Sequence, residues 1–296
     1  MNVLCPQCKQ ESSLFFQTKD LNQKISCEIF DYYICPKCRL IFLFPVPSDI
    51  GIYYRGNYPA YAIPTSIEDL IAKSEKVRFR IEIVQKFVTQ GCLLEIGPSY
   101  GGFAFLAKQA GFEVKVIEMD KQCCQFLTDV VGVYSINTDN VIMALWEAPR
   151  YNVIALWHVI EHLSEPWTIL NMLAKLLLPG GIIVISTPNP DSLQFKILKR
   201  YWVNVDAPRH LELIPATLLK RFMHERGLET VLITTTDKDG LTLNRFGWNV
   251  SLMHLFNNPI GKLSMRVMWR IISFVLNPIE RNGLHGSAYT MVFRKN

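Results

Sequence analysis

Short apolar runs alternate with longer stretches of helical periodicity through the middle of the chain. The apolar runs cover residues 92–96, 114–118, 133–136, 153–157 and 182–187. Helical spacing of apolar residues extends from Ile67 to about Val88, and then over about 101–110, 121–131 and 166–177. Strands that alternate with helices are typical of a parallel sheet covered on both faces. The pattern therefore predicts an α/β fold.

Residues 240–287 form a segment that is too long for an ordinary loop and is expected to carry its own structure. Within it, Leu263 to Leu276 is predicted as a mostly apolar helix. Lys262, Arg266 and Arg270 recur four residues apart on one stripe of this helix. A basic amphipathic helix suits a membrane surface or a lipid-linked acceptor, so residues 262–276 are a candidate for membrane contact. Covering a core or a dimer partner is the alternative and the commoner role.

Composition places the chain among globular proteins, because 49% of its 296 residues are hydrophobic and 19% are charged. No signal-peptide pattern is visible, and no uncharged run reaches the ~18 residues of a membrane span. A cytoplasmic location is expected, with a peripheral position at the inner face of the membrane as the alternative. The net charge of +5 is concentrated in residues 245–296, which hold seven Lys/Arg and one Asp/Glu. This tail favours an anionic partner, unless its charges are simply solvated.

Four of the eight cysteines form two matched C-x-x-C pairs near the N-terminus, Cys5 with Cys8 and Cys35 with Cys38. Two such turns brought together supply four thiolates at tetrahedral spacing, which is the ligand set of a structural zinc ion. Residues 1–46 are therefore predicted to form a zinc ribbon. Two disulfides are the alternative, but they require an oxidising compartment. A tyrosine-rich connector, residues 47–66, follows the ribbon.

A glycine-containing loop follows the first predicted strand of the α/β region. In it, Gly97 and Gly101 lie between that strand and the next helix, where they allow a ligand to approach the backbone. Glu118 ends the following strand, and a carboxylate at that position can accept both ribose hydroxyls of a nucleoside. The loop lacks the full pyrophosphate-binding pattern. A ligand with ribose but without phosphates is therefore expected.

These motifs resemble those of class I S-adenosylmethionine-dependent methyltransferases, and the stretches 151–163 and 176–189 extend the likeness. The first motif is Glu95, Gly97 and Gly101, with Ser99 where a middle glycine is expected. The resemblance implies a doubly wound, Rossmann-like sheet of seven mainly parallel strands over residues 67–296, ending in an antiparallel strand at 288–294. It also implies roles for cofactor-binding residues: Glu95 near the methionine amino group, Gly97 and Gly101 around the ligand, Glu118 at the ribose, and Asp139 or Asn140 at the adenine.

The segment from His158 to His162 also has the H-x-x-E-H order of inverted zinc peptidases, with Glu161 as the glutamate. Two histidines four positions apart share a face only on a continuous helix, and here they straddle a strand-to-helix junction. A catalytic zinc ion would also need a third protein ligand, and no downstream glutamate stands out. The peptidase interpretation is therefore the least favoured one.

In the methyltransferase frame, His158 and His162 would face the reactive methyl group, where an imidazole can take a proton from an acceptor. His162 is the preferred base, because a histidine of similar sugar C-methyltransferases aligns with it. Residues 202–218 resemble the acceptor-side loop of the same enzymes. From this loop His210 is a further candidate base, Asp206 and Arg209 are expected to position the acceptor, and Trp202 is expected to line its pocket. Capping or packing is the alternative role of each histidine.

The sequence thus predicts a methyltransferase with an N-terminal zinc ribbon, similar to bacterial enzymes that act on sugars and polysaccharide precursors. The expected cofactor is S-adenosylmethionine, and the preferred acceptor is a small molecule such as a nucleotide-linked sugar, with O- and C-methylation both open. Methylation of a lipid or quinone-like acceptor at the membrane surface is the alternative. A zinc-ribbon protein that binds nucleic acid is an alternative of another class, and the ribbon's lack of a basic stripe weighs against it.

Overall fold

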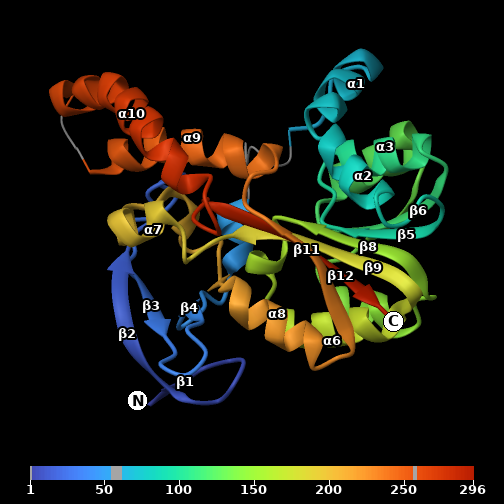
Figure 1. Cartoon of the computed structure of the whole chain (residues 1–296). Helices are drawn as coiled ribbons and strands as arrows, with labels where there is room; N and C mark the ends of the chain where they lie inside the picture. Colours follow the sequence, from blue (N-terminus) through green and yellow to red (C-terminus); the bar gives the residue numbers. More distant parts are fainter. Residues whose placement is uncertain (1, 55–61, 256–258) are drawn as a thin grey trace.

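A seven-stranded sheet forms the centre of the computed structural model, which describes residues 2–54, 62–255 and 259–296, without the side chains of 259–267. Its strand order is β11-β12-β9-β8-β5-β6-β7 (Figure 1). These strands are β5 (Gly91–Ile96), β6 (Phe112–Glu118), β7 (Tyr134–Asn137), β8 (Tyr151–Trp157), β9 (Leu177–Pro188), β11 (Leu228–Thr234) and β12 (Ala288–Lys295). The strands β5 to β9 pair in parallel, and β12 is antiparallel to both of its neighbours. The predicted Rossmann-like sheet with an antiparallel last strand is confirmed.

Helices cover both faces of this sheet, because alternate strand residues point to opposite sides. The helices are α1 (Ile67–Lys76), α2 (Arg78–Gln85), α3 (Gly102–Gln109), α4 (Lys121–Phe126), α5 (Val141–Trp146), α6 (Pro166–Leu176) and α8 (Ala216–His224). Leu93 packs in a core with α1, α2 and α3, whereas its neighbour Leu94 packs in a core with α5, α6 and α8. Figure 1 shows α1 to α3 on one side of the sheet and α6 and α8 on the other.

Two predicted helices differ from the observed ones. The helix expected from Ile67 to Val88 is divided into α1 and α2 at Val77, whose N–H bonds to the Ser74 carbonyl, so the backbone leaves helical geometry there. The helix expected over 121–131 is α4 followed by a π-helical turn, η3 (Leu127–Val131). Apolar periodicity continues through both junctions, so spacing alone does not reveal the change in backbone geometry.

A second sheet holds the N-terminal residues, in the order β1-β2-β3-β4-β10. Its strands are β1 (Val3–Leu4), β2 (Glu11–Thr18), β3 (Phe30–Ile34), β4 (Ile41–Leu43) and β10 (Glu212–Leu213). The edge strand β10 comes from the distant segment that follows β9, and it pairs with β4. The division into 1–46, 47–66 and 67–296 stays a prediction. The two parts of the chain nevertheless share this sheet.

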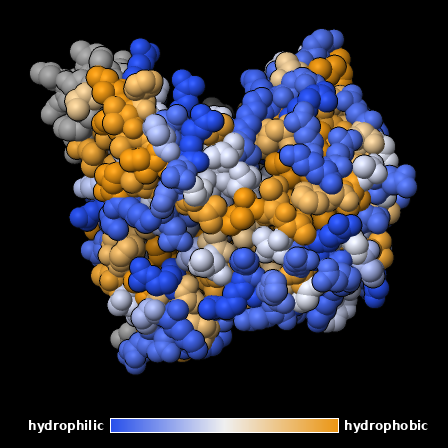
Figure 2. Space-filling model, in the orientation of Figure 1, coloured by the Kyte–Doolittle hydropathy of each residue, from blue (hydrophilic) through white to orange (hydrophobic). Residues whose placement is uncertain are grey.

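The long insertion carries two helices, α9 (Lys238–His254) and α10 (Pro259–Glu280), as its length predicted. A short helix, α7 (Leu193–Leu198), packs near them. Of the predicted basic stripe, Lys262 and Arg266 lie outside the described side chains, and Arg270 stacks on Trp269 at 5.7 Å. No helix among the described residues is long and apolar enough to cross a membrane. Figure 2 shows a hollow between α9 and α10 on one side and α1 to α3 on the other.

Candidate active site

The glycine loop between β5 and α3 has a backbone that side chains would obstruct. Gly97 has φ +64° and Gly101 has φ +82°, both in the left-handed region that glycine adopts without strain. A Cβ atom on Gly97 would lie 2.7 Å from Val159 Cγ2, and one on Gly101 would lie 2.3 Å from Leu127 Cδ2. Ser99, at the expected glycine position, also has a positive φ of 57°. The loop at the carboxyl end of β5 therefore requires glycine at positions 97 and 101, because Val159 and Leu127 pack closely against its backbone.

Glu95 lies just before this loop, near the end of β5. Its side chain is buried, and its Oε2 atom has no hydrogen-bond partner among the described residues. Burial raises the pKa of Glu95 to about 8, although the nearby Arg80 guanidinium opposes the rise. A buried carboxyl group with an unused oxygen needs a donor or a cation to compensate for its desolvation.

Glu118 ends β6 beside the same loop. Its Oε2 accepts the Ser99 N–H at 2.9 Å, and its Oε1 accepts the Asp120 N–H at 2.8 Å. Burial raises the pKa of Glu118, while these two N–H groups oppose the rise. Each carboxylate oxygen keeps a second lone pair, so both can still accept from a ligand.

Asp139 and Asn140 follow β7, the strand beside β6, and both are exposed. The Asn140 side-chain oxygen is engaged in capping α5, where it accepts the Met143 N–H at 3.0 Å. Asp139 is therefore the better candidate of the two for a ligand contact at this edge. Glu95, the glycine loop, Glu118 and Asp139 all lie at the carboxyl ends of neighbouring strands, where ligands bind in such sheets.

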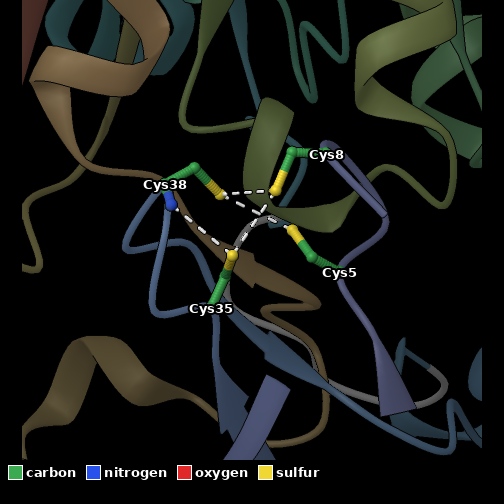
Figure 3. A group of neighbouring side chains, drawn as sticks. All are labelled: Cys5, Cys8, Cys35 and Cys38. Atoms are coloured by element: carbon green, nitrogen blue, oxygen red, sulfur yellow. Dashed lines mark hydrogen bonds between the residues drawn. The ribbon is translucent and has the colours of Figure 1, made fainter. Parts of the chain in front are cut away.

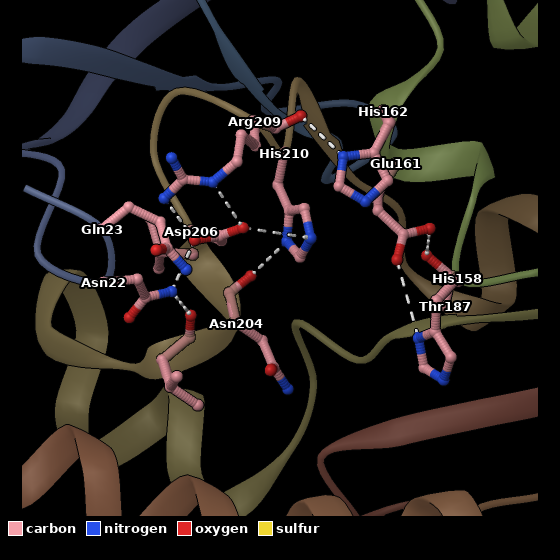
Figure 4. A network of polar contacts seen from close by, with 12 residues as sticks. Asn22, Gln23, His158, Glu161, His162, Thr187, Asn204, Asp206, Arg209 and His210 are labelled. Atoms are coloured by element: carbon pink, nitrogen blue, oxygen red, sulfur yellow. Dashed lines mark hydrogen bonds and ion pairs between the residues drawn. The ribbon is translucent and has the colours of Figure 1, made fainter. Parts of the chain in front are cut away.

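His158 and Glu161 form a pair at the carboxyl end of β8. His158 has φ +57°, and its Nδ1 lies 3.6 Å from Glu161 Oε1 (Figure 4). Thr187 donates to Glu161 Oε2 at 2.9 Å, and Glu161 is fully buried. Burial opposes ionisation of Glu161, but His158 together with His162 and His210 outweighs this effect, and the pKa of Glu161 falls to about 2. Burial disfavours the protonated form of His158, but the adjacent Glu161 carboxylate favours it more strongly, and the pKa of His158 is raised.

His162 lies at the end of the short turn η4 (Ile160–His162), so it does not share a helical face with His158. Its Nδ1 is 3.0 Å from both the Tyr54 hydroxyl and the Arg209 carbonyl. Its ring meets the His210 ring edge to face, with centroids 4.6 Å apart. Burial and the neighbouring His210 lower the pKa of His162 to about 4. The structure thus pairs His162 with His210, not with His158 as a peptidase would require.

The loop that carries His210 lies against the N-terminal sheet. The Tyr32 hydroxyl donates to the His210 carbonyl at 2.8 Å. Arg209 is fully buried and forms ion pairs with Asp20 and Asp206, each at 2.7 Å. Arg209 was expected to position an acceptor, but these two carboxylates occupy its guanidinium instead.

Trp202, which was expected to line the acceptor pocket, lies in the core instead. It is 1% exposed and packs in the core that joins the N-terminal sheet to α7 and α9. Its indole N–H donates to Gln194 at 3.3 Å. Trp202 is therefore a core residue and does not line an open pocket.

Three residues that the sequence did not single out lie at this site. Arg80 of α2 pairs with Asp239 of α9 at 2.7 Å, and its guanidinium lies 5.0 Å from the centre of the Trp157 ring. Asp239 Oδ2 is also 3.9 Å from His158 Nε2. Tyr54, from the turn η1 (Ile50–Tyr54), reaches His162. Only the tyrosine-rich composition of the connector gave a signal for any of them.

The four cysteines of the C-x-x-C pairs come together in the N-terminal sheet (Figure 3). Three Sγ–Sγ distances are 3.5, 3.5 and 3.7 Å, between Cys5 and Cys38, Cys8 and Cys35, and Cys8 and Cys38. Four sulfur atoms about 2.3 Å from a zinc ion would be about 3.8 Å apart in a tetrahedron. The thiols are unbonded to one another, and their spacing fits a zinc ion.

Comparison with known proteins relates the chain to methyltransferases. Residues 69–233 match a family described as "Methyltransferase domain". The chain is 30% identical over 109 residues to a ubiquinone biosynthesis O-methyltransferase of Cereibacter sphaeroides, covering 35% of this chain and 42% of that protein. A protein of the same name from Psychrobacter arcticus is 27% identical over 122 residues, covering 40% of this chain and 42% of that protein. The match thus spans less than half the length of these relatives.

A solved structure has a similar fold. The S-adenosylmethionine-dependent methyltransferase from Archaeoglobus fulgidus superposes with a TM-score of 0.52 at 20% sequence identity. The superposition covers 75% of this chain and 94% of the other. At this identity the likeness is one of fold.

Proposed function

This chain belongs to the methyltransferase domain family, in the class I S-adenosylmethionine-dependent group, and we propose that it methylates a small-molecule acceptor. The observation that carries this proposal is the buried Glu95 carboxyl group with an unused oxygen beside the glycine loop. The ammonium group of a methionine moiety is a cation that would compensate for this desolvation. No pyrophosphate-binding pattern competes for the same loop.

Four features of the site suit the three parts of the cofactor, which are its methionine, ribose and adenine groups. Glu95 would hold the methionine ammonium, and the loop backbone at Gly97 and Gly101, both with positive φ, would lie around the amino-acid end. Glu118 would accept the two ribose hydroxyls, because each of its oxygens retains a lone pair. Asp139 would lie near the adenine at the edge formed by β7. When bound, S-adenosylmethionine supplies an electrophilic methyl group and leaves as S-adenosylhomocysteine.

His158 is the best-placed base among the three candidate histidines. It follows β8, the strand beside β5, and its side chain is 24% exposed, against 10% for His210. His158 is supported by the buried Glu161, an arrangement that orients an imidazole and stabilises its protonated form. In the proposed reaction His158 takes the proton of an acceptor hydroxyl or activated carbon, whose lone pair then forms the bond to the methyl group. His162 and His210 remain alternative bases, each with its Nδ1 engaged by a backbone carbonyl.

The preferred acceptor is a small molecule such as a nucleotide-linked sugar of a glycan precursor. This choice rests on the resemblance to sugar methyltransferases and on the polar groups around His158, which include Asp239 and Ser186. Hydroxyl-rich acceptors require such groups for orientation. The insertion helix α9 supplies Asp239, so the segment after β11 would contribute to acceptor recognition.

A lipid or quinone-like acceptor at a membrane surface is a second candidate, favoured by the insertion. A groove between α7, α9 and α10 is lined by apolar residues with Lys199 and Arg200 at its edge. On α10, Phe274 is 83% exposed and Ile271 and Val275 are each 60% exposed. Figure 2 shows hydrophobic surface over the part of α10 that is not grey. Exposed apolar side chains beside basic ones suit an anionic membrane. The names of the curated relatives point to the same acceptor class.

A structural zinc ion at the four N-terminal cysteines completes the proposal. The near-tetrahedral spacing of the thiols supports it, and four thiolates leave no open position for catalysis. The zinc ion would hold together the sheet that packs against the His210 loop. Its role would therefore be to position that loop.

Calorimetric titration with S-adenosylhomocysteine tests the cofactor site. The parent should bind it, and Glu118→Ala should weaken binding by at least about tenfold, because two ribose hydrogen bonds are lost. Glu113→Ala is the matched control, since Glu113 lies on the same strand but its side chain is 66% exposed. A folded parent that binds nothing, or equal affinities for Glu118→Ala and Glu113→Ala, would contradict the proposal.

Methyl-transfer assays with a nucleotide-linked sugar and with a vesicle-borne phenol would then separate the two acceptor classes.

A further inference from the structure

A second group of potential metal ligands lies away from the cysteines, at Glu161, His162 and His210. Each offers one ligand atom, and the three atoms lie within 4.8 Å of one another. Two of the three residues are buried, and His162 is partly exposed. Figure 4 shows the His162 ring between the His210 ring and the Glu161 carboxylate. The cluster is formed by the turn η4 and by the loop that precedes β10, which are far apart in sequence.

Both histidines are oriented as metal-binding histidines usually are. His162 Nδ1 lies 3.0 Å from the Arg209 carbonyl, and His210 Nδ1 lies 2.7 Å from the Asn204 carbonyl. A carbonyl oxygen only accepts, and the Tyr54 hydroxyl beside His162 Nδ1 donates to the same Arg209 carbonyl at 3.2 Å, which leaves its oxygen able to accept. With these partners, we assign the hydrogen of each neutral ring to Nδ1 and the lone pair to Nε2. An N–H held by a backbone carbonyl fixes the tautomer and the ring orientation of a metal ligand.

Glu161 supplies the negative charge that such a cluster needs. Its Oε2 accepts from Thr187, but its Oε1 has no hydrogen-bond donor among the described residues. The nearest basic atom, His158 Nδ1, is 3.6 Å away. A fully buried carboxylate with an unused oxygen is costly unless a cation lies near it. Asp206 is the other nearby carboxylate, 4.0 Å from His210 Nε2, and it shares the Arg209 guanidinium with Asp20.

We propose that Glu161, His162 and His210 bind one divalent metal ion, separate from the ion at the cysteines. Two imidazoles and one carboxylate suit a borderline divalent ion such as Zn²⁺, Mn²⁺ or Co²⁺. Bond lengths of about 2.0–2.2 Å would draw the three ligand atoms closer together than 4.8 Å. Three protein ligands leave coordination positions open, which distinguishes this site from the closed shell of four thiolates.

The role of this ion rests on the proposed methyl transfer. Glu161 lies between the metal ligands and His158, so the ion would be next to the proposed base. An acceptor hydroxyl at an open position would have a lowered pKa, because the positive charge stabilises its deprotonated form. His158 would then remove the proton, and the acceptor oxygen would form the bond to the methyl carbon while the sulfur–methyl bond of the cofactor breaks and S-adenosylhomocysteine leaves. The acceptor class this favours is a hydroxyl compound, and hence O-methylation.

Zinc content and zinc coordination of the full chain test the metal site without any acceptor. After equilibration with zinc and removal of the excess, elemental analysis should find two ions per parent chain and one in His210→Asn. His254→Asn is the matched control, because the His254 Nδ1 also lies near a backbone carbonyl, that of Tyr201 at 3.2 Å, but outside the cluster. This control should keep two ions. Equal zinc content in His210→Asn and the parent would refute the site.

X-ray absorption of the parent provides a measurement that needs no variant. Zinc should show nitrogen or oxygen neighbours at about 2.0–2.1 Å as well as sulfur at about 2.3 Å. A shell of sulfur alone would overturn the proposal. S-adenosylhomocysteine binding, measured on the same samples, reports on the proposed methyltransferase function separately. A chain that binds this ligand but holds zinc only through sulfur would retain the function and lose the second metal site.

Discussion

At the scale of single residues, the proposed role of Glu95 links proton release to cofactor binding. Burial raises the pKa of its carboxyl group to about 8, so the ligand-free protein holds a proton there at neutral pH. The ammonium of S-adenosylhomocysteine favours the ionised carboxylate, and binding must release that proton. Affinity should therefore rise between about pH 6 and pH 8, by up to about tenfold per pH unit.

Calorimetry across this pH range, in buffers of different ionisation enthalpy, measures both the affinity and the released proton. Glu95→Gln should bind more weakly at pH 8, and its affinity should be nearly independent of pH, because an amide does not titrate. An affinity of the parent that stays constant between pH 6 and pH 8 would show that Glu95 does not face the ligand.

Gly101 supports the loop through two separable effects, its backbone conformation and its lack of a side chain. A Cβ atom there would lie 2.3 Å from Leu127 and would also be strained at φ +82°. Gly101→Ala should therefore lower the free energy of unfolding by roughly 2–4 kcal/mol. Gly227→Ala is the control, since Gly227 has φ +75° but no atom within 4 Å of an added Cβ. Urea denaturation should show a loss of only about 1 kcal/mol for the control; equal losses would mean that the loop moves to avoid Leu127.

At the scale of elements, the pair between Arg80 and Asp239 joins α2 to α9 beside the proposed base. Its side chains are 17% and 21% exposed, so water screens the pair less than a surface pair. A double-mutant cycle with Arg80→Gln and Asp239→Asn should give a coupling energy of about 1–2 kcal/mol in thermal unfolding. The exposed pair of Arg78 and Glu75, 48% and 47% exposed, should give less than about 0.5 kcal/mol. Similar couplings for the two pairs would mean that α9 is not held to α2 by this contact.

The sequence predicted the elements whose signals are local. The strand before Gly97, the loop itself and Glu118 fall within 28 residues of continuous α/β pattern, and each lies where it was expected. The seven mainly parallel strands and the antiparallel last strand followed from the same pattern together with the resemblance. Arg80 and Asp239 are 159 residues apart, and Tyr54 and His162 are 108 apart. Periodicity describes only near neighbours, so contacts between distant segments could not be read from it.

The surroundings of residues 202–210 also depend on contacts between distant segments, which could not be predicted from the sequence. Polar residues in a loop near a predicted site suggested contact with an acceptor, but charge and spacing do not reveal burial. Arg209 is 0% exposed, and Asp20, from the loop between β2 and β3, helps to compensate its buried charge. That partner lies 189 residues earlier in the chain. The pairing of Arg209 with both carboxylates could not be predicted, because Asp20 reaches Arg209 only where the N-terminal sheet packs against this loop.

At the scale of the whole molecule, the N-terminal sheet and the methyltransferase sheet meet around the His210 loop. The strand β10 pairs with β4, so the last strand of the small sheet directly follows His210 and Leu211. Asn22 donates to the Val203 carbonyl at 2.9 Å, and Thr18 donates to the Arg200 carbonyl at 3.2 Å. The proposed cofactor residues Glu95 and Glu118 lie on β5 and β6, which pair only within the seven-stranded sheet among the described residues. Disruption of the small sheet should therefore reach the histidines before it reaches the cofactor site.

Loss of the proposed zinc ion at the four cysteines is predicted to impair methyl transfer while cofactor binding is retained. Cys35→Ser removes one of the four thiolates, and the small sheet should then lose order, which lowers the thermal unfolding midpoint. Methyl transfer should fall by at least about tenfold, because the His210 loop loses the contacts that position it. Affinity for S-adenosylhomocysteine should stay within about threefold of the parent. Cys27→Ser, at an exposed cysteine outside the cluster, should leave all three quantities unchanged. If cofactor affinity and transfer fell together in Cys35→Ser, the small sheet would be supporting the entire fold, and its proposed role in positioning one loop would be wrong.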